Sequence, residues 1–325
     1  MEYVRLGQSG LEVSRIVLGC MSFGEPSQGT HNWSLGLDES RPFFRQALES
    51  GITTFDTANV YSRGVSEEIT GQLLGEFAKR DEVIIATKVF NRMGPGPKGA
   101  GLSRGAVFAQ VEESLRRLRT DYIDLYQIHR YDPAVPIEET MEALHDLVKA
   151  GKVRYLGASS MSAWQFVQAQ YVADLNGWTR FVSMQDQYNL IMREEEREML
   201  PFCLDQGVGV LPWSPLARGR LTRDWNATTA RSETDRFLRT LYNQAVESDR
   251  KIVEAVQAIA SERDVPRAQV ALAWLLHQPA VTAPIVGVTK PQHLTDAVAT
   301  VALELSEDEL TRLEEPYVPR QPQGY

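Results

Sequence analysis

The stretch ITTFDTANVY (residues 52–61) places a carboxylate and a phenol where a buried strand becomes a loop. Ile52, Thr53 and Thr54 form a β-branched run that is typical of a strand. Asp56 then ends this strand, and Tyr61 follows five residues later. A carboxylate at the end of a buried strand needs either a turn-forming role or a chemical one.

Similar β-branched runs alternate with helical patterns along the chain, which is typical of βα units. The helical pattern is clearest after Ser103, where apolar residues recur at helical spacing behind a serine suited to the N-cap. Ser66 is predicted to begin a second helix in the same way, and Gly51 and Gly151 lie where helices should end. The predicted strands are residues 16–18, 53–55, 83–87, 123–128, 153–158, 181–184, 208–211 and 284–286.

Eight strands, each followed by a helix, favour a closed (β/α)8 TIM barrel over an open doubly wound sheet. Residues 3–14 are predicted to form a hairpin that plugs the N-terminal end of the barrel. No break in composition marks a second domain, so residues 1–325 are expected to form one domain. The irregular segments are two long loops, expected at the C-terminal face of the barrel, and a poorly ordered tail: residues 90–102, 217–245 and 316–325.

Composition excludes several classes of protein. The chain has 325 residues, of which 43% are apolar and 24% charged, enough for a large core. There is no apolar leader and no apolar run long enough to span a membrane, so we expect neither export nor membrane insertion. The net charge of −9 argues against a nucleic-acid surface. Cys20 and Cys203 are far apart and indicate reduced packing residues in a cytoplasmic protein.

Three consecutive predicted strands end in polar residues. In this architecture catalytic side chains lie at the C-terminal ends of the strands. The second strand ends in Asp56, the third in Lys88 and the fourth in His129, so all three would point into one pocket. Tyr61 would reach in from the loop after Asp56. Singly, each residue has a common structural role as a turn, a solvated charge or a packed polar group, but their joint placement favours a shared site.

These residue types suggest a tuned proton donor. An adjacent ammonium lowers the pKa of a phenol from about 10 toward working pH, so that Tyr61 becomes a usable general acid. Asp56 would keep Lys88 charged and in place, and His129 would orient a carbonyl oxygen. The scattered histidines predict no metal site, and no serine triad is supported. GPGPKG (residues 94–99) has the spacing of a dinucleotide fingerprint, but its prolines and the missing helix argue against one.

With these motifs in this order, the chain resembles the aldo-keto reductases, which are NADPH-dependent carbonyl reductases built on a (β/α)8 barrel. The resemblance covers essentially the whole chain, and its finer features are most similar to the aryl-alcohol dehydrogenase and potassium-channel β-subunit branch. The stretches that carry it are LGQSGLEVSRIVLG (6–19), GITTFDTANVYS (51–62), IATKV (85–89), DYIDLYQIH (121–129), GKVRYLGASS (151–160) and, for the branch, THNWSLG (30–36), HRYDP (129–133) and VLPWSPLARG (210–219).

The resemblance implies that Ser159 and Gln185 hold the nicotinamide carboxamide and that Trp213 stacks on the ring. Each also has an ordinary alternative role: Ser159 as a helix cap, Gln185 as the partner of a buried backbone group, and Trp213 as packing. Ser160 replaces an asparagine that is common in the family's motif. The resemblance also implies a catalytic tetrad in which Tyr61 is the proton donor. Its members are Asp56, Tyr61, Lys88 and His129.

The phosphates are implied to bind at two segments. Residues 214–221 would lie along the pyrophosphate, using backbone amides with Ser214, Leu216 and Arg218. GVTKPQHLTDAV (287–298) aligns with the family's adenosine site, whose helix N-terminus favours an anion. Thr289 and Lys290 fall where a 2′-phosphate would sit, which implies NADPH rather than NADH. Three positions in the adenosine site depart from the branch, which often has glutamine, glutamate and asparagine there: His293, Asp296 and Ala297.

Trp33 and Phe90, with Met93 and Tyr317, are predicted to line a substrate pocket suited to an aryl or hydrophobic aldehyde. The leading hypothesis is an NADPH-dependent reductase of a small-molecule carbonyl substrate, with NADPH or NADP as the cofactor. One alternative is a nucleotide-sensing regulatory subunit with slow turnover and a protein partner. Another is an aldolase that uses Lys88 as a Schiff base, although the neighbouring Asp56 argues against it.

Overall fold

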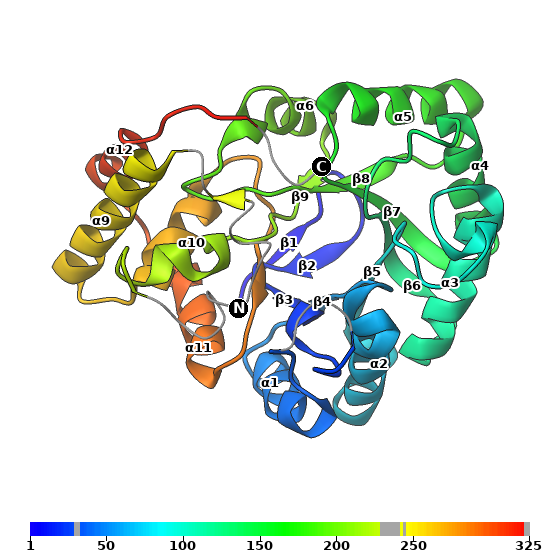
Figure 1. The fold of residues 1–325 in the computed structure, drawn as a ribbon, viewed down its shortest axis with the longest axis horizontal. Coiled ribbons are helices and arrows are strands. Elements are labelled where there is room, and N and C mark those ends of the chain that lie inside the picture. Colours follow the sequence, from blue (N-terminus) through cyan, green and yellow to red (C-terminus); the bar gives the residue numbers. More distant parts are fainter. Residues whose placement is uncertain (29–32, 228–240, 243–244, 322–325) are drawn as a thin grey trace.

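The computed structural model describes residues 1–28, 33–227, 241–242 and 245–321. They contain an eight-stranded parallel sheet in the order β10-β3-β4-β5-β6-β7-β8-β9, with helices arranged around it (Figure 1). Strands that follow one another in sequence are neighbours, as expected when helices connect them. The strands are β3 (Val17–Gly19), β4 (Thr54–Asp56), β5 (Ile84–Val89), β6 (Ile123–Ile128), β7 (Val153–Ser159), β8 (Phe181–Gln185), β9 (Gly209–Val210) and β10 (Ile285–Gly287).

The sheet closes because the chain around β10 contacts β9 as well as β3. Val210 of β9 forms a parallel bridge with Val281, and its carbonyl accepts a hydrogen bond from the Thr282 amide over 2.9 Å. The Ile285 amide donates to the Pro212 carbonyl, also over 2.9 Å, while β10 pairs with β3. The predicted (β/α)8 fold is therefore confirmed, and each predicted strand overlaps an observed one.

Helices cover the outside of the barrel. As predicted, Ser103 caps α3, because its hydroxyl accepts a hydrogen bond from the Ala106 amide over 3.3 Å. Gly51 and Gly151 follow the ends of α1 and α4 in the left-handed conformation, with φ of 81° and 73°. No helix in the described ranges is long and apolar enough to cross a bilayer. The α-helices are α1 (Leu37–Glu49), α2 (Val65–Phe77), α3 (Arg104–Leu118), α4 (Ile137–Lys149), α5 (Ala163–Asn176), α6 (Met199–Gln206), α9 (Val246–Arg263), α10 (Arg267–His277), α11 (Pro291–Ala299) and α12 (Glu307–Glu314).

A helix begins at the predicted place, but Ser66 does not cap it. The N-cap of α2 is Gly64, whose φ of 97° suits glycine, and an added Cβ there would lie 2.7 Å from the Arg117 side chain. Ser66 lies inside the helix, where its hydroxyl donates to the Cys20 carbonyl over 2.8 Å and contacts the Thr57 hydroxyl at 2.9 Å. The hydroxyl thus bonds to the segments that follow β3 and β4 instead of making a local capping bond.

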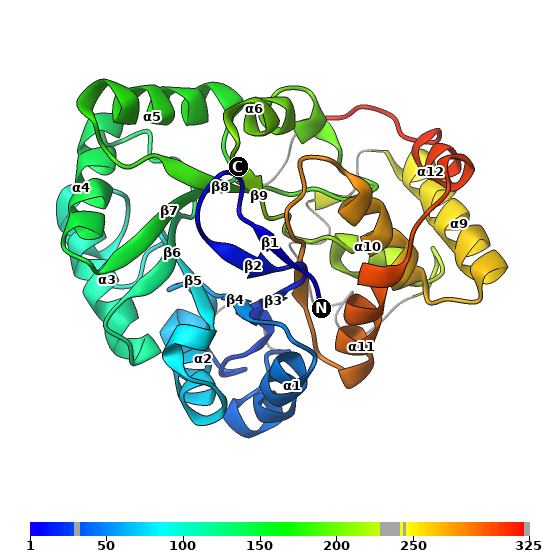
Figure 2. The ribbon, with the colours of Figure 1, turned by 180° about the vertical axis from the view of Figure 1, so that it is seen from behind.

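A hairpin closes the N-terminal end of the barrel, as predicted. Its strands β1 (Tyr3–Arg5) and β2 (Glu12–Ser14) are antiparallel, and they cross the barrel opening in Figure 2. The Gln8 amide donates to the Gly207 carbonyl over 2.8 Å, which ties the turn to the chain just before β9. Apolar hairpin residues extend the lower layer of the barrel interior: Leu6, Leu11 and Val13 pack with Val17, Ala86, Leu125, Leu211, Ala283 and Ile285.

The layer above this apolar plug is polar. Side chains on one face of a strand recur every second residue. Lys88 therefore lies above Ala86 on β5, and Gln127 lies above Leu125 on β6. The alternation places polar groups at the C-terminal end of the barrel while the N-terminal end stays apolar.

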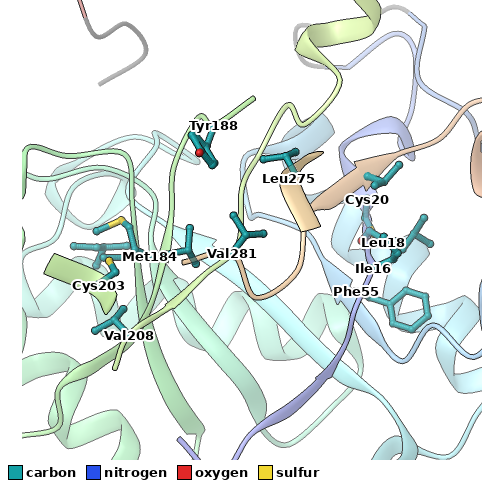
Figure 3. Close-up of a cluster of buried hydrophobic side chains, with 14 of the residues drawn as sticks. Ile16, Leu18, Cys20, Phe55, Met184, Tyr188, Cys203, Val208, Leu275 and Val281 are labelled. Carbon is teal, nitrogen blue, oxygen red and sulfur yellow. Dashed lines mark hydrogen bonds between the residues drawn. The ribbon is translucent and has the colours of Figure 1, made fainter. Parts of the chain in front are cut away.

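A second apolar layer lies between the strands and the helices. Figure 3 shows side chains of this layer, including Leu18 and Phe55 beside Cys20, and Met184 beside Cys203. Phe55 of β4 stacks on Phe44 of α1, with ring centroids 5.5 Å apart. Both cysteines are buried and free, as expected of packing residues.

The prediction of a poorly ordered tail is wrong for residues 316–321, and residues 322–325 lie outside the described ranges. The Tyr317 hydroxyl donates to Glu194 over 2.6 Å, and the Arg320 amide donates to the same carboxylate over 2.7 Å. The Arg320 side chain also lies 2.7 Å from Asp249 of α9, and both are buried. These contacts hold the proline-rich segment against the barrel and engage Tyr317, a predicted substrate wall, in a structural cluster.

Candidate active site

The four predicted catalytic residues meet at the C-terminal end of the barrel. Asp56 ends β4, Lys88 lies near the end of β5, and His129 directly follows β6. Tyr61 begins the 3-10 helix η2 (Tyr61–Gly64) after β4. The Lys88 Nζ atom lies 5.2 Å from the centroid of the Tyr61 ring, and the rings of Tyr61 and His129 meet edge to face at 5.9 Å.

A buried ion pair forms the base of this site. The Lys88 Nζ atom donates to Asp56 Oδ1 over 2.5 Å and to the Thr57 carbonyl over 2.9 Å. Burial alone would lower the pKa of Lys88, but the charges of Asp56 and Tyr61 outweigh it, so the pKa is raised above its ordinary value. Lys88 is therefore a fixed ammonium ion beside the phenol.

Two glutamines complete the ion pair. The side-chain amides of Gln127 and Gln185 donate to Asp56 Oδ2 over 3.0 and 2.9 Å, and Gln185 also donates to the Gln127 amide oxygen over 3.0 Å. Gln127 was not predicted, although its position two residues before His129 on the same strand face is a signal that could have identified it. Gln185 was predicted to contact nicotinamide, and here its side chain holds the carboxylate of the tetrad.

The loop carrying Tyr61 has an unusual backbone. Ser62, Arg63 and Gly64 have φ of 48°, 53° and 97°, so three left-handed residues follow the tyrosine directly. Such conformations cost free energy and persist only where surrounding contacts impose them. The Ser62 hydroxyl supplies such contacts, because it accepts from the Glu25 amide over 2.9 Å and donates to the Glu25 carbonyl over 3.0 Å. The phenol is thereby held in a defined place.

His129 is arranged as a neutral donor. Burial, followed by the charges of Lys88 and Arg130, lowers the pKa of His129 well below its ordinary value. The Asn91 side chain lies 3.1 Å from Nδ1 through its Nδ2 group, which can only donate. Nδ1 is then the acceptor and Nε2 carries the hydrogen. Asn91 and Arg130 were not predicted, and neither follows from strand periodicity.

A second group of predicted residues meets beside the tetrad. The Ser159 hydroxyl donates to the Gln185 carbonyl over 2.8 Å, so it does not cap a helix. The Trp213 indole donates to the Ser160 hydroxyl over 3.0 Å. Ser160 has a φ of 48°, and its amide donates to Asp186 Oδ1 over 2.9 Å. Asp186, which was not predicted, therefore supports the turn after Ser159, to which the Trp213 indole is bonded.

Asp186 is a buried acid. Burial raises the pKa of Asp186 to about 7, while the Ser160 amide and Arg130 act in the opposite direction. Burial and the charge of Asp186 also raise the pKa of Glu195. Two buried carboxyl groups that repel one another do not both ionise easily.

This pKa predicts a loss of stability with rising pH. A folded-state pKa of about 7 lies above the unfolded value near 4, so the stabilising contribution is complete at low pH and is lost as pH rises through about 7. The free energy of unfolding can be measured with urea one pH unit below and one pH unit above this pKa. Between these two values, the wild type should lose about 1 kcal/mol more than Asp186→Asn. The control is Asp121→Asn, which removes an exposed carboxylate. Parallel pH profiles for wild type and Asp186→Asn would contradict this.

The predicted pyrophosphate segment follows Trp213. Ser214, Ala217 and Arg218 have φ of 53°, 48° and 54°, and the 3-10 helix η6 (Ala217–Thr222) begins there. Leu216 precedes this helix, and its carbonyl accepts from the Gly219 amide over 2.8 Å. The segment turns sharply, and its backbone conformation is one that forms anion-binding concavities.

Two arginines beyond the predicted set lie in the same segment. Burial lowers the pKa of Arg220, whose guanidinium group lies 5.0 Å from the Trp225 ring. Burial, followed by the charge of Arg220, lowers the pKa of Arg223. Two half-buried guanidinium groups that repel one another are suited to a polyanionic ligand, because its charge would relieve the repulsion.

The predicted adenosine segment surrounds the start of α11. Lys290 is the exposed N-cap, and the Thr289 amide donates to His293 Nδ1 over 3.3 Å. Asp296 is buried and accepts from Gln292 over 2.7 Å, and the Gln269 amide of α10 lies 3.5 Å away. Asp296 therefore connects α11 to α10, while Lys290 presents a cation at the N-terminus of α11.

Two predicted substrate residues, Phe90 and Trp33, lie in segments that adjoin the strands and loop of the tetrad. Phe90 follows Lys88 by two residues and has a φ of 155°, which L-residues rarely adopt. Trp33 lies two residues before Leu35, whose carbonyl accepts from Gly24 over 2.8 Å. Because Glu25 bonds to Ser62, this segment adjoins the loop of Tyr61. Both aromatic residues are half-buried.

These residues fit a nicotinamide dinucleotide. The Trp213 segment adjoins the tetrad. Arg220 and Arg223 follow it along the chain, and Lys290 lies at the start of α11. Buried or half-buried arginines suit phosphates, and an indole suits a planar ring.

Comparison with known proteins identifies the family of the chain. The sequence profile of the Aldo/keto reductase family matches residues 15–317. Versiconal hemiacetal acetate reductase of Aspergillus parasiticus is 46% identical over 98% of both chains. A putative aryl-alcohol dehydrogenase of Schizosaccharomyces pombe is 45% identical over 99% of this chain and 97% of its own, and one of Saccharomyces cerevisiae is 40% identical over 98% of both. The chain belongs to the aldo/keto reductase family.

Proposed function

We propose that the protein reduces an aldehyde or ketone with NADPH and that Tyr61 is the proton donor. The observation that carries this proposal is the position of the phenol, which lies beside the Lys88 ammonium ion and edge to face with the neutral His129. A carbonyl oxygen placed between Tyr61 and His129 would meet two hydrogen-bond donors. When bound, the cofactor would supply a hydride to the carbonyl carbon.

The side chains of the site have separate roles in the proposed reaction. The Nε2–H group of His129 positions the carbonyl oxygen, and the Tyr61 hydroxyl gives it a proton as negative charge develops there. Lys88 stabilises the phenolate that remains, because its ammonium group is held close by Asp56. Gln127 and Gln185 satisfy the second carboxylate oxygen and keep the pair in one orientation.

The cofactor would lie across the predicted contacts. Ser159 and Trp213 would meet the nicotinamide, and the segment with Ser214, Leu216 and Arg218 would meet the pyrophosphate. Arg220 and Arg223 extend that positive segment. At the far end, Thr289, Lys290 and His293 would meet the adenosine part with its 2′-phosphate, and Asp296 would hold α11 in place.

An aldolase mechanism is disfavoured by the state of Lys88. A Schiff base requires a neutral amine, which enzymes obtain by lowering the pKa of a lysine. Here the pKa of Lys88 is raised, and its ammonium group donates to both Asp56 and the Thr57 carbonyl.

The direct test is oxidation of NADPH, with NADH alongside, against a panel of aromatic and aliphatic aldehydes. Turnover that depends on the carbonyl compound would support the proposal. The relatives named as an aryl-alcohol dehydrogenase and a hemiacetal acetate reductase make aromatic carbonyl compounds the first choice. Tight binding of NADPH without turnover on any carbonyl would instead favour a nucleotide-sensing subunit.

Lys290→Ala is expected to weaken NADPH much more than NADH. A hydrogen bond to a charged group contributes about 1.5–3 kcal/mol, so the KM for NADPH should rise about tenfold or more. NADH lacks the 2′-phosphate, and its KM should change little. Alanine at the exposed Lys251 of α9 provides the control. Equal effects of Lys290→Ala on the two cofactors would show that this side chain does not read the 2′-phosphate.

Trp33→Ala is expected to change the order in which the enzyme prefers aldehydes. Removing a large apolar surface should raise KM for aromatic aldehydes by about tenfold while small aliphatic aldehydes change less. The measurement is kcat/KM across the same panel. An unchanged ranking would remove Trp33 from the substrate pocket.

A further inference from the structure

One helix carries an unusual concentration of exposed apolar side chains. Of the eight large hydrophobic residues exposed in the described part of the chain, four belong to α5. Trp164, Val167, Tyr171 and Leu175 are 62%, 41%, 64% and 70% exposed. Their spacing of three, seven and eleven residues from Trp164 places them on one stripe, because an α-helix turns once every 3.6 residues. We call these four residues the α5 stripe.

The opposite face of α5 already satisfies the barrel. Phe166 is fully buried, stacks on Phe181 at 5.9 Å and meets Phe202 of α6 edge to face at 5.8 Å. The α5 stripe therefore is not needed for the core, and it faces away from it. Figure 1 shows α5 at the periphery, between α4 and α6.

The helix is also almost without charge. Its sequence AWQFVQAQYVADLN contains one ionisable acid, Asp174, which pairs with Arg180 at 3.5 Å. By contrast, α12 reads EDELTRLE. Two copies of a chain with a net charge of −9 repel one another over most surfaces, and an uncharged helix face is where that repulsion is weakest.

We propose that the α5 stripe is the interface through which two copies of this chain form a dimer. In a twofold arrangement with antiparallel helices centred between Ala169 and Gln170, Trp164 of one copy packs against Leu175 of the other. Gln168 and Tyr171 then face one another near the axis. The stripe is self-complementary in this arrangement, as a twofold interface requires.

The area is consistent with a dimer. An aromatic side chain buries roughly 150–250 Å² in full, so the stripe exposes on the order of 450 Å² of side chain. That lies within the roughly 300–600 Å² of the largest apolar patch on a typical monomer, and it is a little more than half of the roughly 800 Å² that each partner contributes to a stable interface. The uncharged polar residues beside the stripe, Gln165, Gln168 and Asn176, would supply the rim.

The interface connects to the candidate active site. The Tyr131 ring lies 6.2 Å from the Trp164 ring, and Tyr131 follows His129 by two residues. A dimer would bury Trp164 and so hold the rim segment that begins at His129. The dimer does not depend on the proposed reaction, and its test is independent of activity.

The test is sedimentation velocity of the full chain over a wide range of concentrations. The wild type is expected to reach twice the mass of the 36.5 kDa chain. Tyr171→Glu should weaken association at least about thirtyfold, because the substitution places two carboxylates near the axis and removes an aromatic anchor. Val246→Glu, which changes an exposed apolar residue on α9, should associate like the wild type. A wild type that stays a single chain at every concentration would overturn the proposal, as would a Tyr171→Glu dimer of full affinity.

Cross-linking gives a second test that leaves the apolar residues unchanged. Gln168→Cys lies near the proposed axis, so a short bifunctional thiol reagent should link two copies through it. Asn176→Cys should not react in this way, because antiparallel helices would place the two copies of that residue about 20 Å apart along the helix axis. The native cysteines are buried and do not compete. Efficient linking at Asn176→Cys, or none at Gln168→Cys, would exclude this arrangement.

Discussion

Tyr61→Phe is expected to lower kcat for carbonyl reduction by about 10²–10⁴-fold, the range that a positioned general acid contributes. The substitution removes only the hydroxyl group, so the ring keeps its contacts with Lys88 and His129. Binding of NADPH, measured by fluorescence titration, should stay within about twofold, because the loss concerns the transition state.

Tyr131→Phe is the matched control for this prediction. Tyr131 lies near the same rim but packs on Trp164, and its loss of a hydroxyl should leave kcat nearly unchanged. A Tyr61→Phe enzyme that keeps more than about a tenth of kcat would assign the proton to another donor. His129 would then be the next residue to test, because it is the other hydrogen-bond donor beside the proposed carbonyl oxygen.

Lys88→Met is expected to destabilise the fold by about 3–5 kcal/mol, because it leaves the buried Asp56 without its cation. Adding Asp56→Asn should recover most of this loss, since an amide carries no charge and can still accept from Gln127 and Gln185. Urea unfolding of the two single variants and the double variant gives the coupling energy. Both variants that carry Lys88→Met should be inactive.

The exposed pair of Lys79 and Glu82, with atoms 3.2 Å apart, provides the comparison. Lys79→Met should change the unfolding free energy little, because solvent screens an exposed pair and the remaining carboxylate stays hydrated. If the double variant at Asp56 and Lys88 were as unstable as the sum of the two single variants, the buried charge would not be the cause of the loss.

The periodic pattern of apolar residues and the order of the strands were enough to predict the barrel. They also predicted that the four residues of the tetrad lie close together. Strands of β-branched residues alternate with helices, and in a parallel barrel all strands end at one face. Asp56 and Lys88 lie at the inner face of neighbouring strands, and His129 follows the next strand. Their proximity therefore required no knowledge of long-range side-chain contacts. Gln127 lies on the same inner face, two residues before His129, so strand periodicity also predicts that it faces the site.

Other features depended on contacts that no local pattern contains. Ser66 has the local appearance of a cap, yet its hydroxyl bonds to Cys20, which is 46 residues away. The tail has a composition typical of disorder, yet Glu194 holds it from 126 residues away.

The chain's own pattern of apolar and polar residues was sufficient for the (β/α)8 order and for the strand ends that carry the tetrad, because both follow from repeats of two and 3.6 residues. The barrel's closure decided the rest: it brought Gln185 to Asp56 across 129 residues, placed Asp186 under Ser160, and left the α5 stripe exposed. Those outcomes depend on which side chains meet in space, and sequence spacing carries no record of that.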